Sequence, residues 1–175
     1  MPKKRVLVDA CVILPATNIG EWNRLCGYFD VETVDQVVAE TQRGDMTRRS
    51  YVKVDEKHLR VTLNKVHPVS DHERDALTEK LYELGLDPID PGERDLFAHI
   101  LCKEKLSPNV LVLTTADRGA ARAACALGWN DSLVSLESLL KECGAPKKAM
   151  EKLDSQATEK FLSGVKSNFA LGLLK

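Results

Sequence analysis

Blocks of apolar residues alternate with polar segments along the chain in the order expected of an α/β protein. Short apolar runs rich in β-branched residues predict buried strands at 5–9, 31–34, 110–114 and 132–135. Apolar residues at helical spacing predict helices at 17–28, 35–44, 70–84, 91–101, 120–127 and 136–143. The stretch 47–65 is rich in surface residues and is assigned no further than a helical part followed by an extended part.

This order of elements predicts the fold class and the domain limits. Strands that alternate with helices indicate a three-layer α/β sandwich with a mostly parallel central sheet and right-handed crossovers. The last helix of the pattern ends near Gly144, so we expect a domain over 1–145 and a helical extension over 146–175. Because open α/β sheets carry their sites at the carboxyl edge, that edge is where chemistry is expected.

Composition indicates a folded protein without a membrane segment. The 175 residues are 43% hydrophobic and 29% charged, with a formal net charge of -1, which is enough apolar material for a core and too little net charge for a disordered chain. No apolar run approaches the roughly 20 residues of a membrane span. Asp9 interrupts the apolar stretch after the basic N-terminus, which disfavours a signal peptide. We therefore expect a cytoplasmic protein.

Charge is distributed unevenly along the chain. Residues 41–65 carry a formal charge of +4 and 146–175 carry +3, whereas 66–145 carry -6. Basic segments that flank an acidic middle allow a polyanion to bind at one edge of a protein without net positive charge. The alternative is an ordinary solvated surface, and it is the favoured interpretation for 146–175.

Cysteine and histidine show no zinc-site spacing. The five cysteines include no Cys-x-x-Cys pair and are expected to be reduced thiols. The four histidines are scattered along the sequence, and His99, among apolar neighbours on a predicted helix, is expected to be a packed side chain rather than a ligand.

Two aspartates follow predicted strands directly. Asp9 ends the run Val-Leu-Val, and Asp117 follows the strand at 110–114. A carboxylate at the end of a buried strand loses hydration unless a positive charge lies beside it. Two such acids at neighbouring strand ends are stabilised by a cation between them. The alternative for Asp9 alone is that it caps the following helix or accepts backbone hydrogen bonds.

Three further acids are candidates for the same site. Glu40 lies among valines on the inner side of a short helix, although a residue at the helix boundary would look the same. Glu93 and Asp95 lie in the first turn of the helix at 91–101. Residues two apart on a helix point about 200° apart, so only a loose first turn lets both line one small site. The choice between them stays open, and acids in a first turn also favour the helix dipole.

Several carboxylates without a Cys/His cluster favour Mg²⁺ or Mn²⁺ over Zn²⁺. Such an ion orients and helps to deprotonate a water for in-line attack on a phosphodiester, and it stabilises the leaving oxygen. Other enzyme and binding classes with an α/β fold are disfavoured because the sequence lacks the residues that define them. A haloacid dehalogenase phosphatase needs an acid where Cys11 stands, and the chain has no acidic pair of a receiver domain, no Gly-x-Gly-x-x-Gly, no P-loop and no Gly-x-Ser-x-Gly.

Four segments, in this order, resemble the PIN-domain nucleases over about residues 4–143. They are Val6-Leu-Val-Asp9-Ala-Cys-Val-Ile-Leu14, Val37-Val-Ala-Glu40, Gly92-Glu-Arg-Asp95-Leu-Phe-Ala98 and Leu113-Thr-Thr-Ala-Asp117-Arg. The resemblance implies a PIN-like fold and a Mg²⁺ or Mn²⁺ site.

The resemblance also implies roles for individual residues. The acids that match the family's metal site are Asp9, Glu40, Asp95 and Asp117, and Glu93 is an additional or replacement acid. Thr115 resembles the hydroxyl residue that supports the last acid. The sequence departs from the family where Ala10-Cys11 replaces the Thr or Ser with Asn that often follows the first Asp.

By the same resemblance, the expected activity is that of a metal-dependent endoribonuclease. The basic candidates for RNA contact are Arg43, Arg48, Arg49, Arg94 and Arg118, with Tyr51 as a base-stacking residue. Many small proteins similar to this chain are VapC-like toxins of toxin-antitoxin pairs, commonly homodimers that a small antitoxin protein silences. The alternatives are a non-catalytic PIN-like module that binds RNA or a protein, and a nuclease that cuts DNA.

Overall fold

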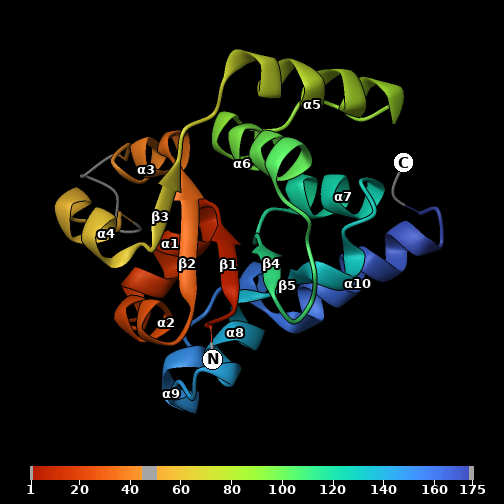
Figure 1. The fold of residues 1–175 in the computed structure, drawn as a ribbon. Helices are drawn as coiled ribbons and strands as arrows, with labels where there is room; N and C mark the ends of the chain where they lie inside the picture. The colour runs from red at the N-terminus through yellow and green to blue at the C-terminus, as the bar shows by residue number, and fades with distance from the viewer. Residues whose placement is uncertain (1, 45–50, 174–175) are drawn as a thin grey trace.

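The computed structural model describes residues 2–44 and 51–173, and it shows an α/β fold with a five-stranded sheet (Figure 1). The strands are β1 (Arg5–Val8), β2 (Asp30–Val34), β3 (Lys65–His67), β4 (Leu111–Thr114) and β5 (Leu133–Val134). All neighbouring strands pair in parallel, in the order β3-β2-β1-β4-β5. The predicted α/β class and parallel sheet are therefore confirmed. β3 was not predicted, because its sequence Lys-Val-His lacks the apolar run that marks the other strands.

Helices connect the strands and cover the sheet. They are α1 (Ala10–Asn18), α2 (Trp22–Tyr28), α3 (Asp35–Thr41), α4 (Glu56–Thr62), α5 (Asp71–Glu83), α6 (Pro91–Lys103), α7 (Arg118–Ala126), α8 (Leu136–Glu142), α9 (Lys147–Met150) and α10 (Glu159–Ala170), with short 3-10 turns η1 (Asn130–Ser132) and η2 (Ser155–Ala157). Figure 1 shows α5 lying across the outside of α6, and these two helices pack together.

The helix predicted at 17–28 is wrong in its limits. The chain forms α1 directly after Asp9 and begins α2 at Trp22. Pro15 concealed α1, because proline lacks the amide hydrogen that a helix interior uses. Its carbonyl still accepts a 3.0 Å hydrogen bond from the Ile19 amide. Gly20, with φ of +79°, ends α1 in the left-handed conformation that glycine adopts readily.

The strand order creates a switch point between β1 and β4. From β1 the chain moves to β2 and β3 on one side, and it then returns to β4 and β5 on the other. Right-handed crossovers therefore place α1 to α4 on one face of the sheet and α5 to α7 on the opposite face. The loops after β1 and β4 leave in opposite directions, and in open α/β sheets this is the place where ligand sites usually lie.

The core lies on both faces of β1 and β4, and α6 packs against the sheet at β2. The core side chains without solvent exposure include Val6, Leu7, Val112, Leu113, Leu96 and Phe97. The N-terminal turn of α6 contacts Glu40 of α3, and the residue after α6, Glu104, binds Arg5 at the start of β1. The helix therefore crosses its face from the carboxyl edge towards the amino edge, which positions polar residues at both of its ends.

The C-terminal segment packs on the rest of the fold. α10 contacts α7 and α8 and buries Leu162 and Val165. Among the described residues, no helix combines the length and the apolar character that a membrane crossing requires. The five cysteines are free thiols, and Cys102 is the exposed one.

A capping box starts α5, as its sequence predicts. The Ser70 hydroxyl oxygen accepts from the Glu73 amide at 3.3 Å, and Glu73 Oε2 accepts from the Ser70 amide at 2.8 Å and from its hydroxyl at 2.7 Å. The two hydrogen bonds from Ser70 lower the pKa of Glu73, and burial opposes them less strongly. The ionised carboxylate therefore stabilises the start of the helix.

Replacing Glu73 by Ala is expected to lower the free energy of unfolding by about 1 kcal/mol at neutral pH, the usual effect of a lost cap. Because the folded-state pKa lies below the ordinary value of 4.5, the carboxylate contributes fully above that value and loses its contribution as the pH falls below it. Urea unfolding at neutral pH and at about pH 3 should show the gap between wild type and Glu73→Ala narrowing at the lower pH. Glu79→Ala, at an exposed position of the same helix, should change stability by less than about 0.5 kcal/mol. An equal loss in both variants would contradict the capping role.

Candidate functional site

Asp9 and Asp117 lie at the switch point of the sheet. Asp9 follows β1 directly, and Asp117 lies three residues beyond β4. The last residues of the two strands, Val8 and Thr114, are paired in the sheet. The two predicted acids therefore leave neighbouring strands at the carboxyl edge.

The Asp9 carboxylate is buried and has one oxygen without a partner. Asp9 is the N-cap residue of α1, and its side chain makes no capping hydrogen bond, although the Val12 amide of the first turn lowers the pKa of its carboxyl. Oδ1 accepts a 2.8 Å hydrogen bond from the Cys11 thiol, whereas Oδ2 is buried and has no partner among the described residues. Burial raises the pKa of Asp9 to about 6, and the charge of Asp117 adds to this; hydrogen bonds from Cys11 and Thr115 act in the opposite direction.

Glu93 joins these aspartates from the first turn of α6. It is 8% exposed. Burial raises the pKa of Glu93 to about 9, and repulsion from Asp9, Asp117 and Asp90 adds to the effect of burial. We call Asp9, Glu93 and Asp117 the acid cluster. Its members cannot all be ionised at neutral pH at low cost unless a cation lies between them.

Asp95 occupies a different electrostatic environment. It accepts two hydrogen bonds from Arg74 of α5, at 2.9 and 2.7 Å, and two longer ones from Arg94, at 3.2 and 3.1 Å. Burial opposes ionisation of Asp95, but the two guanidinium groups outweigh it and lower its pKa. Asp95 is thus neutralised by the protein itself, and Arg94 is engaged with it. Of the two acids that the sequence left open, the geometry favours Glu93 as the third member of the cluster.

Glu40 contacts the turn that carries Glu93. Its Oε1 accepts a 2.7 Å hydrogen bond from the Gly92 amide. A Cβ at position 92 would overlap Glu40 Oε2 and lie 2.7 Å from Glu40 Cδ, so only glycine permits this approach. Glu40 therefore acts as a positioning residue for the start of α6.

Cys11 and Thr115 join the two strand ends. Besides donating to Asp9, the Cys11 thiol accepts a 3.0 Å hydrogen bond from the Ala116 amide and lies 3.5 Å from Thr115 Oγ1. Thr115 Oγ1 also accepts from the Asp117 amide at 3.1 Å. Burial, followed by the charge of Asp9, raises the pKa of the Cys11 thiol and keeps it a donor.

Sequence analysis missed the role of Cys11 and anticipated the position of Thr115. Cys11 stands where the chain departs from the family's residue types, and a thiol is a weak donor that suggests no such role by its type. The available signal was its place two residues after Asp9, in the first turn of a helix that starts directly at the strand end. Thr115 lies beside Asp117, where the resemblance placed a supporting hydroxyl.

The arginines predicted to contact RNA lie in separate places. Arg43 is exposed and lines a cavity of about 460 Å³ with Tyr51 and Lys152. Arg118 is exposed and lines another of about 400 Å³ with Lys160 of α10. Arg48 and Arg49 lie outside the described residues.

The carboxylate oxygens of the acid cluster fit a hydrated divalent ion. Among residues 2–44 and 51–173, one group of three side chains has its potential ligand atoms within 4.8 Å of one another, and that group does not contain these acids. The carboxylate oxygens of the three acids are therefore spaced more widely than 4.8 Å. Mg²⁺ usually keeps several waters and binds only one or two carboxylates directly, which suits this wider spacing. The unpartnered Oδ2 of Asp9 and the raised pKa of Glu93 are both conditions that a cation would relieve.

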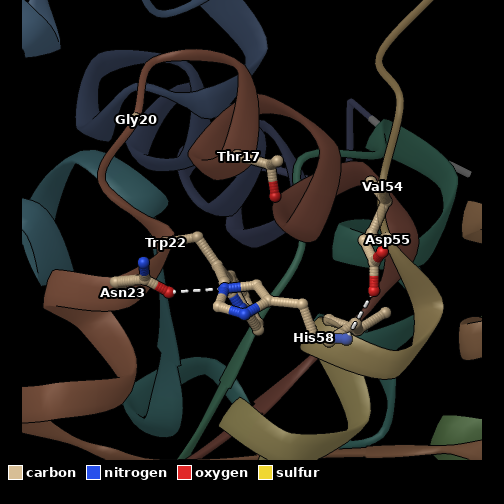
Figure 2. A pocket seen from close by; sticks show the side chains of 8 residues that line it. Thr17, Gly20, Trp22, Asn23, Val54, Asp55 and His58 are labelled. Carbon is tan, nitrogen blue, oxygen red and sulfur yellow. Dashed lines mark hydrogen bonds between the residues drawn. The ribbon is translucent and has the colours of Figure 1, made fainter.

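A smaller cavity between α2 and α4 is unrelated to these acids (Figure 2). The His58 ring lies 2.9 Å from Asn23 Oδ1 on one side, and Asp55 caps α4 on the other. Its volume of about 130 Å³ is below the roughly 300 Å³ of the smallest usual ligand pockets. We therefore assign no ligand to it.

The chain gave no match to protein-family models, to curated proteins or to solved structures. The structure establishes the parallel α/β fold, and any finer assignment depends on the four sequence segments and on where they lie in that fold.

Gly92→Ala is expected to lower the free energy of unfolding by about 1–3 kcal/mol, because the added methyl group overlaps the Glu40 carboxylate. In a Glu40→Ala background the loss should shrink, since the obstructing group is gone. Urea unfolding of the four members of this cycle measures the coupling. As a control, Gly164→Ala in α10, where a Cβ meets nothing within 4 Å, should stabilise by about 0.5–1 kcal/mol. Equal losses in both backgrounds would contradict the contact.

Cys11→Ala is expected to lower the free energy of unfolding by about 1–3 kcal/mol, because it removes a hydrogen-bond donor from a buried carboxylate. Cys11→Ser retains a donor of similar reach and should recover most of that loss. Thermal or urea unfolding under reducing conditions distinguishes the two variants. If Ser and Ala are equally destabilising, the hydrogen bond to Asp9 is not what Cys11 contributes.

Proposed function

We propose that this chain is a Mg²⁺- or Mn²⁺-dependent endoribonuclease of the PIN-domain kind. The observation that carries the proposal is the acid cluster at the switch point: Asp9, Glu93 and Asp117 come from three separate elements, and two of them have raised pKa values. Acids with strongly perturbed pKa values tend to gather at functional sites. The sequence segments of the PIN resemblance include all three acids.

Each group of the site then has a defined role. Asp9, Glu93 and Asp117 would hold the ion, which when bound supplies water activation and stabilises charge on the phosphodiester. Cys11 orients the Asp9 carboxylate, and the Asp117 Oδ1 that accepts from the Ala120 amide fixes that side chain at the start of α7. Glu40 holds the turn of Glu93 through the Gly92 amide.

Exposed cations and one aromatic ring support a single-stranded nucleic acid as substrate. Arg43 and Lys152 offer phosphate contacts beside Tyr51, whose ring packs against Gly44. Arg118 follows Asp117 directly and offers a contact near the reacting phosphate. RNA rather than DNA follows from the resemblance, as do a homodimeric state and a toxin role with a small antitoxin partner.

Cleavage of a labelled single-stranded RNA in Mn²⁺ or Mg²⁺ tests the proposal. Glu93→Gln and Asp117→Asn should each lower the cleavage rate by about 100-fold or more, because both remove a charge from the metal site. Chelation should abolish cleavage. Glu79→Gln and Asp87→Asn change the same residue types at exposed positions and should leave the rate unchanged, with circular dichroism confirming that all four variants are folded.

The same samples separate the alternatives. RNA binding without cleavage by the wild type would show a non-catalytic binding module. Cleavage of single-stranded DNA but not RNA would show a deoxyribonuclease. Cleavage that survives in Glu93→Gln but is lost in Asp95→Asn would show that Asp95 supplies the third acid.

A further inference from the structure

A second group of potential metal ligands lies at the C-terminal half of α6. His67 ends β3, His99 lies within α6, and Glu104 directly follows that helix. One ring nitrogen of each histidine and one carboxylate oxygen of Glu104 lie within 4.8 Å of one another. We call these three residues the histidine cluster. The sequence interpretation of His99 as a side chain that is only packed overlooked it, because the partners are distant along the chain.

The two imidazoles are buried and held face to face. His67 is 4% exposed and His99 is 5% exposed. Their ring centroids are 4.0 Å apart with an interplanar angle of 27°. Two stacked, desolvated imidazoles cannot both carry a positive charge at low cost. Because a metal–nitrogen bond lies in the plane of the imidazole ring, one of the two rings has to turn out of the stack for both to bind the same ion.

Glu32 determines which nitrogen of His67 is available. The His67 Nε2 atom lies 2.7 Å from Glu32 Oε2, and Arg5 donates two hydrogen bonds of 2.8 Å to the same carboxylate. A carboxylate paired with a guanidinium is ionised and only accepts hydrogen bonds. Nε2 of His67 therefore carries a hydrogen, and Nδ1 is the nitrogen left for a ligand. A carboxylate that orients a metal-binding histidine in this way is a usual feature of zinc sites.

The histidine cluster opens to solvent and has a further acceptor beside it. His67, His99 and Glu104 line an open cavity of about 610 Å³ together with Glu73, Lys65 and Lys103. Glu73 is 6% exposed, and its Oε1 is buried without a partner among the described residues. An unpartnered buried oxygen at the rim of the cluster can accept a hydrogen bond from a water held by an ion.

We propose that His67, His99 and Glu104 form a Zn²⁺ site, with water in the fourth position. Two imidazoles and one carboxylate are a usual zinc ligand set, whereas Mg²⁺ prefers oxygen ligands alone. Glu104 also accepts hydrogen bonds from Arg5 at 2.7 and 3.0 Å. Arg5 keeps its pairing with Glu32 when Glu104 turns one oxygen towards the ion, so the guanidinium is not left unpaired.

Such an ion would link α6 to β3. This site lies near the C-terminal end of the helix, whereas Glu93 lies in its first turn. The zinc site is therefore separate from the acid cluster and does not depend on the proposed nuclease activity.

Calorimetric titration of the chelator-stripped full chain with ZnCl₂, in excess Mg²⁺ and a reductant that does not bind metals, tests the proposal. We expect saturable binding of about one ion per chain and a Zn²⁺-dependent rise in Tm. His99→Gln and Glu104→Gln should each weaken binding by at least about tenfold. His72→Gln, at an exposed position, should bind as the wild type does.

Three further measurements identify the ligands. Cys102→Ser should retain the affinity, because the exposed thiol one turn along α6 is not a ligand in this proposal. Glu93→Gln should also retain it, which separates this site from the acid cluster. Co²⁺ bound to the wild type should show a tetrahedral spectrum without thiolate charge-transfer bands, and this result stands even if His99→Gln does not fold. No saturable binding, unchanged affinity in a folded His99→Gln, or loss of binding in Cys102→Ser or Glu93→Gln would overturn the proposal.

Discussion

Burying a carboxylate requires a compensating positive charge or donor, and the residues in and next to α6 meet this requirement in different ways. Asp95 receives two arginines, and Glu104 receives Arg5. Among the described residues no arginine or lysine pairs with Glu93, and burial together with neighbouring acids raises its pKa to about 9. The same physical penalty therefore separates acids that stabilise the fold from an acid that the described residues leave uncompensated.

Glu32 shows how completely the fold satisfies an acid that it uses for structure. Burial opposes its ionisation, but hydrogen bonds from Arg5, His67 and Asn64 outweigh burial and hold the pKa of Glu32 at about 2. Asp9 is equally buried, and among the described residues it receives the weak thiol donor of Cys11 and contributions from Thr115 and the Val12 amide. The Arg5–Glu32 ion pair shows that this fold can compensate a buried carboxylate fully. The incomplete pairing of Asp9 is informative by comparison. It is the reason for proposing a cation at the switch point of the sheet.

The two clusters differ in the chemistry that they favour. The acid cluster offers oxygen atoms alone, at a wider spacing, which suits a hydrated Mg²⁺ or Mn²⁺ ion. The histidine cluster offers imidazole nitrogens within 4.8 Å of a carboxylate oxygen, which suits Zn²⁺. α6 contributes to both, because it crosses the sheet from one edge towards the other. One helix therefore contributes residues both to the acid cluster, which favours Mg²⁺ or Mn²⁺, and to the histidine cluster, which favours Zn²⁺.

The sequence by itself determined the fold class and the principal acids. Short apolar runs rich in β-branched residues favour buried strands in a sheet covered on both faces. Asp9 follows such a run directly and Asp117 lies three residues after another, so their place at the carboxyl edge followed from local pattern. The capping box of α5 was equally local. The sequence did not reveal α1, because it contains Pro15, a residue that usually interrupts helices. It did not reveal β3, because Lys-Val-His lacks the apolar run of the other strands.

Only the tertiary structure decided which acids belong together. Glu93 and Asp95 are two residues apart and similar in type, and the difference between them comes from Arg74, which α5 brings to Asp95 from 21 positions away. The Ala116 amide met the Cys11 thiol, and His67 met His99, for the same reason. Electrostatic and hydrogen-bond partners are set by distances in space, and local pattern contains no information about partners that the sheet and α6 bring together from distant parts of the chain.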